Sequence, residues 1–210
     1  AEIGSIRSAR GPFIGLAKGY NAIYGHWGGE HDILLRLRGG IINNVDALVN
    51  PFDAYFRKRQ ISMPHNGFTS YQGFLQASGQ LGYNTFFEAE SFFLFEKAKP
   101  CGDCPAQMIA IGYPGVFRVS YDYNPQTGRY MRFKGGSPEI DKLTQAPVEV
   151  DNVIIMRTHI YPTYSQYADA KIDGKEGAMQ AFIGGKVIEG TWEKANFDAP
   201  LLFFDAQGNP

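Results

Sequence analysis

The stretch AMQAFIGGKVIEGTW, residues 178–192, predicts a β-hairpin in the second half of the chain. Strand-forming residues lie on both sides of the pair Gly184 and Gly185. A tight two-residue turn needs positive φ angles, which glycine adopts without steric cost, so a glycine pair between two such runs is typical of an antiparallel hairpin. We therefore expect residues 178–183 and 186–192 to pair as neighbouring strands.

The same alternation of strands and turns begins at about residue 106. Residues 124–128 have turn composition between two tyrosine-containing runs and predict a second hairpin, and residues 205–208 predict a further turn. Further strands are expected over residues 108–113, 116–123, 129–133 and 153–161. The second half of the chain is therefore predicted to be antiparallel β-sheet.

The first half mixes helical and strand patterns. The periodicity of apolar residues predicts helices over residues 12–19, 30–38 and, from a cap at Ser70, to about residue 81, with strands over 22–26 and 41–45. Phenylalanines at positions 86, 87, 92, 93 and 95 are expected in a core or at a seam. The sequence thus predicts an α+β protein, with an α/β first half, residues 1–105, packed against an antiparallel β-sheet second half, residues 106–210.

Composition excludes several classes of protein. The chain has 210 residues, 44% of them hydrophobic, and a formal net charge of -1. Nucleic acid is not an expected partner, because phosphate backbones are bound through a clear cationic surplus. No stretch approaches the roughly 20 consecutive apolar residues of a membrane-spanning helix.

The two cysteines, Cys101 and Cys104, lie in one short segment flanked by prolines. A zinc site needs about four ligands, and a redox motif of this spacing normally opens a helix after a strand. The spacing therefore favours a local disulfide or an inert thiol pair, with redox chemistry or metal binding as the remaining alternatives.

Several separated segments together resemble the YerB-like family of bacterial lipoproteins, which contains the domain of unknown function 3048 and its C-terminal part. The segments are residues 4–10, 22–29, 56–57, 64–66, 121–123, 128–132, 151–154 and 190–192. The resemblance implies an exported protein at the outer face of the cytoplasmic membrane, which touches the membrane only through a lipid anchor absent from this chain. On the oxidising side of a membrane, Cys101 and Cys104 are expected to form a disulfide.

The resemblance also implies further strands before Gly4 and after Pro210. The ends of the chain are therefore expected to lie beside open sheet edges, where a strand could be exchanged with another chain.

The polar residues of these segments suggest an anion site. Arg7 and Arg10 precede an expected helix start, with Gly11 as N-cap and Pro12 as the first helical residue, so guanidinium groups and helix-start amides would face one anion. The candidate ligand-binding residues are Arg7, Ser8, Arg10, His26, Arg57, His65 and Asn66. The alternative is that the arginines pair with acids such as Glu30, Asp32 and Asp53 and only tie loops together.

Catalytic signatures are weak. The chain has no G-x-S-x-G elbow, no H-E-x-x-H and no phosphate-binding glycine pattern in its required context. Zinc held by His26, His31, His65 and His159 would need four distant segments, so no metal and no cofactor are expected. Tyr121, Tyr123, Tyr130 and Trp192 could stack on sugars if exposed, but aromatic residues in hairpins more often cover a core.

We therefore expect a binding or interaction module of the cell envelope that recognises an anionic cell-wall polymer or an envelope protein. One alternative is a cell-wall-modifying hydrolase or transferase that uses His26 or His65 beside the arginines. The other is a structural scaffold of a membrane-associated complex.

Overall fold

The computed structural model describes residues 2–86, 92–93, 95, 99–163 and 167–210. The chain forms two compact units. Unit 1 contains Ala1–Phe92, His159–Lys175 and Lys194–Leu201, and unit 2 contains Phe93–Thr158, Glu176–Glu193 and Leu202–Pro210. Two segments of the second half thus belong with the first unit. The division into continuous halves at residue 105 stays a prediction, and it does not coincide with these units.

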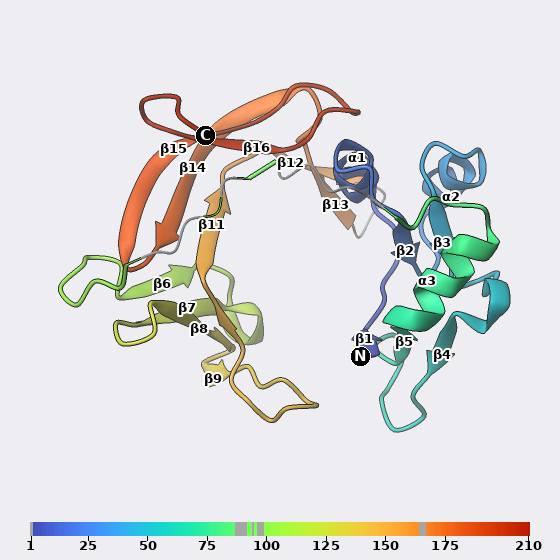
Figure 1. The fold of residues 1–210 in the computed structure, drawn as a ribbon, viewed down its shortest axis with the longest axis horizontal. Helices are drawn as coiled ribbons and strands as arrows, with labels where there is room; N and C mark the ends of the chain where they lie inside the picture. Colours follow the sequence, from blue (N-terminus) through green and yellow to red (C-terminus); the bar gives the residue numbers. More distant parts are fainter. Residues whose placement is uncertain (1, 87–91, 94, 96–98, 164–166) are drawn as a thin grey trace. The chain divides into compact units, whose positions relative to one another are not determined.

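Unit 1 carries all the α-helices of the described chain, with short strands around them (Figure 1). The helices are α1 (Gly11–Gly19), α2 (His31–Arg38) and α3 (Tyr71–Gln80), and a short 3-10 helix covers Pro51–Asp53. The strands are β1 (Glu2–Gly4), β2 (Tyr24–His26), β3 (Asn44–Asp46), β4 (Tyr55–Arg57), β5 (Gly67–Ser70), β12 (Ile160–Thr163) and β13 (Tyr167–Ala170).

The strands of unit 1 form three small sheets. β1, β5 and β4 make an antiparallel sheet in that order, β2 and β3 pair in parallel, and β12 and β13 form an antiparallel pair. Two groups of buried side chains hold these elements together: Ala9, Ile14, Ile33, Leu37 and Ile42 in one, and Val45, Ala47, Ala54, Tyr55 and Ala77 in the other. The Ser70 side chain accepts a hydrogen bond from the Gly73 amide, which confirms it as the cap of α3.

Lys194 closes the loop that follows it and pairs with Asp173, both within unit 1. Its side chain is fully buried, and its ammonium group donates to the backbone carbonyls of Asn196, Phe197 and Ala199 at 2.7–2.9 Å. The Asp173 carboxylate lies 3.1 Å from the same nitrogen. Since three carbonyls already use the three ammonium protons, this carboxylate is attracted by charge and is not hydrogen-bonded.

Unit 2 consists of antiparallel β-sheet. One sheet contains β6 (Met108–Ile111), β7 (Val119–Asn124), β8 (Arg129–Lys134), β9 (Ser137–Pro138) and β10 (Glu149–Val150). The other has the order β11 (Asn152–Met156), β14 (Lys175–Ile183), β15 (Lys186–Lys194), β16 (Leu202–Asp205). Helices in the first half and sheets in the second confirm the predicted α+β class.

Both predicted hairpins are confirmed. β14 and β15 are neighbours joined at Gly184 and Gly185, whose φ angles are 58° and 85°. β7 and β8 pair around residues 125–128. Tyr130 and Trp192 are completely buried, so the interpretation of these aromatic residues as core is correct.

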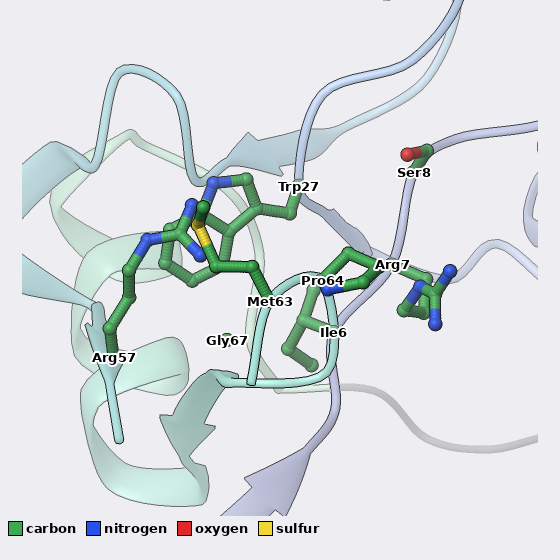
Figure 2. Close-up of a pocket in the computed structure, with 8 residues that line it drawn as sticks. All are labelled: Ile6, Arg7, Ser8, Trp27, Arg57, Met63, Pro64 and Gly67. Carbon is green, nitrogen blue, oxygen red and sulfur yellow. The ribbon is translucent and has the colours of Figure 1, made fainter. Parts of the chain in front are cut away.

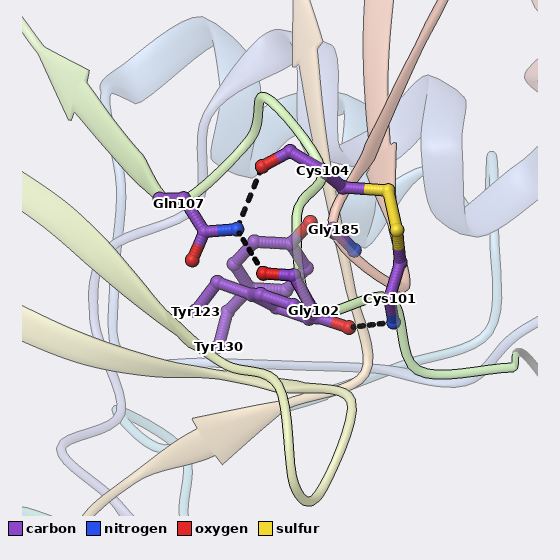
Figure 3. The surroundings of a disulfide bond; sticks show 7 residues. All are labelled: Cys101, Gly102, Cys104, Gln107, Tyr123, Tyr130 and Gly185. Carbon is purple, nitrogen blue, oxygen red and sulfur yellow. Dashed lines mark hydrogen bonds between the residues drawn. A yellow bond between two sulfur atoms is a disulfide. The ribbon is translucent and has the colours of Figure 1, made fainter.

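The disulfide lies against this core (Figure 3). Cys101 and Cys104 are bonded, as predicted, and the Cys101 amide donates to the Tyr123 hydroxyl at 3.0 Å. The Tyr130 hydroxyl accepts from the Gly185 amide at 3.0 Å. The bonded loop is thereby connected to the same aromatic pair that supports the turn between β14 and β15.

Some local predictions are wrong. The strand expected over residues 153–161 is two strands, β11 and β12, which lie in different sheets. The strand expected from residue 116 begins at Val119, after a short 3-10 helix, Gly115–Phe117. Of the phenylalanines expected in a core or at a seam, Phe86 and Phe95 are largely exposed, at 89% and 81%, whereas Phe92 packs against Tyr20 and Phe93 against Phe203. Phe87 lies outside the described residues.

β1 and β16 are edge strands of their sheets. No helix in the described ranges is both long and apolar enough to cross a lipid bilayer.

Candidate functional site

A pocket of about 300 Å³ opens within unit 1, between the segment after β1 and the loop that joins β4 to β5 (Figure 2). It is lined by Ile6, Arg7, Ser8, Trp27, Arg57, Met63, Pro64 and Gly67. The sequence predicted Arg7, Ser8 and Arg57 as ligand-binding residues, and the structure brings these three to one pocket. The prediction did not include the apolar residues Ile6, Trp27, Met63 and Pro64.

One wall of the pocket is the segment after β1, and backbone hydrogen bonds hold this segment on both sides. The Ile6 amide donates to the Gly67 carbonyl at 2.8 Å, and the Trp27 amide donates to the Arg7 carbonyl at 2.9 Å. The Ala9 amide donates to the Gly28 carbonyl at 2.7 Å, and Ala9 forms a parallel bridge with Gly29. Arg7 and Ser8 therefore project from backbone that is held in place before any ligand arrives.

The second wall is the loop between β4 and β5. The Lys58 amide donates to the Asn66 carbonyl at 2.9 Å, and the His65 amide donates to the Ser62 carbonyl at 3.0 Å. These bonds close the loop and place Met63 and Pro64 at the pocket.

Arg57 is oriented by two neighbours, neither of which is charged. Its guanidinium carbon lies 4.1 Å from the centre of the Trp27 ring, within cation–π range. Its Nη1 donates to Oδ1 of the buried Asn66 at 2.7 Å. Trp27 itself packs closely over Gly67, where a Cβ atom would lie only 2.4 Å from the indole ring. Glycine at 67 is therefore required for Trp27 to support Arg57.

Arg7 is also oriented by a neutral group. Its Nη1 lies 2.9 Å from Nδ1 of His65. Because a guanidinium group only donates, His65 accepts through Nδ1 and its ring is neutral in this contact. His65 and Asn66, two predicted site residues, thus act here by holding Arg7 and Arg57.

No carboxylate neutralises these two arginines within the part of the chain that the structure describes. None has an oxygen within 4.0 Å of a guanidinium nitrogen of Arg7 or Arg57, whereas Arg129 and Arg132 each form such a pair. Glu30, Asp32 and Asp53 therefore do not form the ion pairs with Arg7 or Arg57 that the alternative required. Two positive charges face the pocket without an acidic partner.

Arg10 does not line the pocket. It is the N-cap residue of α1, one position before the expected cap at Gly11. Its Nη1 donates to the Ala9 carbonyl, and its backbone and charge act on Tyr24, whose pKa burial raises and Arg10 lowers in part. The predicted convergence of Arg7 and Arg10 on one anion at the helix start is not what the geometry shows.

The start of α1 already faces a carboxylate of this chain. An Oδ2 atom of the buried Asp169, on β13, lies 3.2 Å from the position that a Cβ on Gly11 would take. The partial positive charge of the helix start is thus directed at an internal acid.

His26 is a structural residue in this fold. It is fully buried, its Nδ1 lies 3.1 Å from the Gly28 carbonyl, and its Nε2 lies 3.1 Å from Oδ1 of Asn44. It also stacks on Tyr24. Its predicted contact with a ligand, and its use as a base in the hydrolase alternative, both need an accessible ring that His26 does not have here.

The described residues contain no group of three or more His, Cys, Asp or Glu side chains placed to hold a metal ion. A second pocket, of about 310 Å³, lies in unit 1 near the ends of α2 and α3 and is lined mainly by apolar residues such as Leu34, Leu37 and Ile42. It contains none of the predicted site residues.

In the comparison with known proteins, two domain models of a single family match most of the chain. Residues 1–84 match the model "Protein of unknown function (DUF3048) N-terminal domain", and residues 109–210 match the corresponding C-terminal domain. "Putative lipoprotein YerB" of Bacillus subtilis is 28% identical over 197 residues, which cover 92% of this chain and 59% of that protein. The chain therefore spans less than two thirds of the length of this relative.

A crystal structure of YerB protein from Bacillus subtilis has the same fold. It is similar to this structure with a TM-score of 0.82 at 24% identity, over 98% of this chain and 69% of that one. The two family models together cover far more than half of the chain, and this chain belongs to the DUF3048 family, with both its N-terminal and its C-terminal domain present.

Proposed function

We propose that this protein is a binding module of the bacterial cell envelope, and that its pocket at Arg7 and Arg57 recognises an anionic ligand. The assignment to the envelope, on the outer side of the cytoplasmic membrane, is supported by the relative named as a lipoprotein. The disulfide between Cys101 and Cys104 is in keeping with an oxidising compartment.

One observation carries the proposal of an anion. Arg7 and Arg57 are each oriented by a neutral acceptor, His65 and Asn66, and not by a carboxylate. A carboxylate would cancel the charge that it orients. A neutral acceptor fixes the direction of the planar donor fork and leaves its positive charge for a carboxylate or phosphate of the ligand.

The test is calorimetric titration with two polymers, polyglycerol phosphate as the phosphate-rich probe and polyglutamate as the carboxylate-rich probe. Loss of one charge-assisted contact removes about 1.5–3 kcal/mol, so Arg7→Ala and Arg57→Ala should each weaken binding by about tenfold or more. Binding should also weaken as salt is added.

Arg59→Ala is the matched control. Arg59 lies in the same loop between β4 and β5, is exposed, and does not line the pocket. The Arg59→Ala substitution removes one positive charge from the same loop but not from the pocket, so the affinity should be close to that of the parent. Equal binding of either polymer by the parent and all three variants would contradict the proposed site, and so would an equal loss in all three.

A further inference from the structure

The two arginines of the pocket are separate binding points. Arg7 comes from the segment after β1 and is held by His65, whereas Arg57 comes from the end of β4 and is held by Asn66 and Trp27. In Figure 2 they lie on opposite sides of the pocket, with Pro64 between them. Neither depends on the other for its orientation.

Apolar surface lies between these two points. Ile6, Met63 and Pro64 line the pocket there, and Met63 is 72% exposed although its side chain is apolar. A ligand with a single anionic group would leave one guanidinium group without a counter-charge and would leave this apolar surface in water. A ligand with an anion at each end and an apolar spacer would satisfy all three features.

We infer that the pocket takes a dianionic ligand, in which two phosphate or carboxylate groups are joined by a short apolar spacer that covers Ile6, Met63 and Pro64. This inference rests on the proposed function, because it assumes that Arg7 and Arg57 bind anions. It adds the number of anionic groups and the chemistry between them.

The experiment compares linear alkane bisphosphonates of increasing chain length with alkyl monophosphonates of the same lengths, by calorimetry on the whole chain. At one chain length the bisphosphonate should bind about tenfold or more tightly than its monophosphonate, since the second anion binds without a second loss of free motion. Bisphosphonates that are much shorter or longer should lose this advantage.

Variants assign the two ends of the ligand. Arg7→Gln and Arg57→Gln should each reduce the affinity for the best bisphosphonate to about that for its monophosphonate, and Arg59→Gln should leave it unchanged. Arg7→Lys and Arg57→Lys keep the positive charge at each point but lose the planar pair of guanidinium donors. These lysine variants replace the glutamine variants if a glutamine variant melts at a lower temperature than the parent.

The outcomes separate this inference from the function on which it rests. If every bisphosphonate binds only as well as its monophosphonate, and binding still depends on Arg7 or Arg57, the anion site stands and the dianionic ligand is wrong. If neither series binds, or if binding ignores both arginines, the inference and the proposed function both fail.

Discussion

Lys194→Met should destabilise unit 1 strongly. The lysine carries a charge with no exposure to water, and the methionine has a similar length and no charge. Three backbone carbonyls and the Asp173 carboxylate surround the ammonium group. The substitution leaves three acceptors without their donor and a carboxylate without its counter-charge.

The expected loss follows from what the lysine side chain does. Hydrogen bonds from a charged donor contribute about 1.5–3 kcal/mol each, but burying the ammonium group costs several kcal/mol, which methionine does not require. Removing one partner of a buried ion pair costs about 3–5 kcal/mol net, and we expect a value in this range for the free energy of unfolding. For a chain of this size, that corresponds to a fall in melting temperature of about 6–20 °C.

The assay is thermal unfolding followed by circular dichroism, with urea unfolding as the second measure. Lys175→Met is the control, because Lys175 is exposed and the substitution has the same chemistry. A melting temperature for Lys194→Met within a few degrees of the parent, and no lower than that of the control, would refute the reasoning. It would mean that the three carbonyls find water as an equal partner.

Two further changes test other parts of the fold. Gly185→Ala should cost about 1–3 kcal/mol of stability, because a Cβ there lies 2.7 Å from the Tyr123 ring at a φ of +85°, and Gly136→Ala, with a φ of +86° and open space, measures the backbone strain alone. If urea unfolding gives the two alanine variants the same loss, contact with Tyr123 does not matter. Burial raises the pKa of Tyr55 above its usual value of 10.0, so unfolding releases a proton at high pH and stability should fall as the pH rises past about 10. Tyr55→Phe should reduce this slope, at the cost of the hydrogen bond to the Val45 carbonyl, and an unchanged slope in urea unfolding between pH 9 and 11 would speak against it.

The neutral orienting groups also allow an anion site in a protein whose net charge is close to zero. The formal net charge is -1, and yet two guanidinium groups at one pocket have no carboxylate within ion-pair distance among the described residues. Local positive potential depends on where charges lie and on what surrounds them, not on their total. A binding site for anions therefore needs no basic composition.

The sequence by itself determined the elements whose cause is local. The turn at Gly184 and Gly185 needs positive φ angles that only those residues supply easily, and Ser70 caps α3 with its own hydroxyl. Neighbouring residues decide such features, so the hairpin, the cap and the α+β class could be predicted correctly. Arg7 and Arg57 became site candidates because they lie in the segments that resemble the family, and Arg7 also because it precedes the expected helix start.

Only the tertiary structure decided how these residues are used. Arg57 meets Trp27 and Arg7 meets His65 because backbone bonds from Ile6 to Gly67 and from Trp27 to Arg7, between segments distant in the sequence, close the pocket. The pattern around His26 did not show that packing between β2 and β3 buries its ring.

Residues 194–201 belong to unit 1, where Lys194 pairs with Asp173, and the strand expected over residues 153–161 divides between two units because β11 pairs with β14 and β12 pairs with β13. The Asp173 partner of Lys194 and the β14 partners of β11 lie more than 20 positions away in the chain. Local propensity carries no information about such contacts, because their free energy arises only when the folded chain brings the partners together.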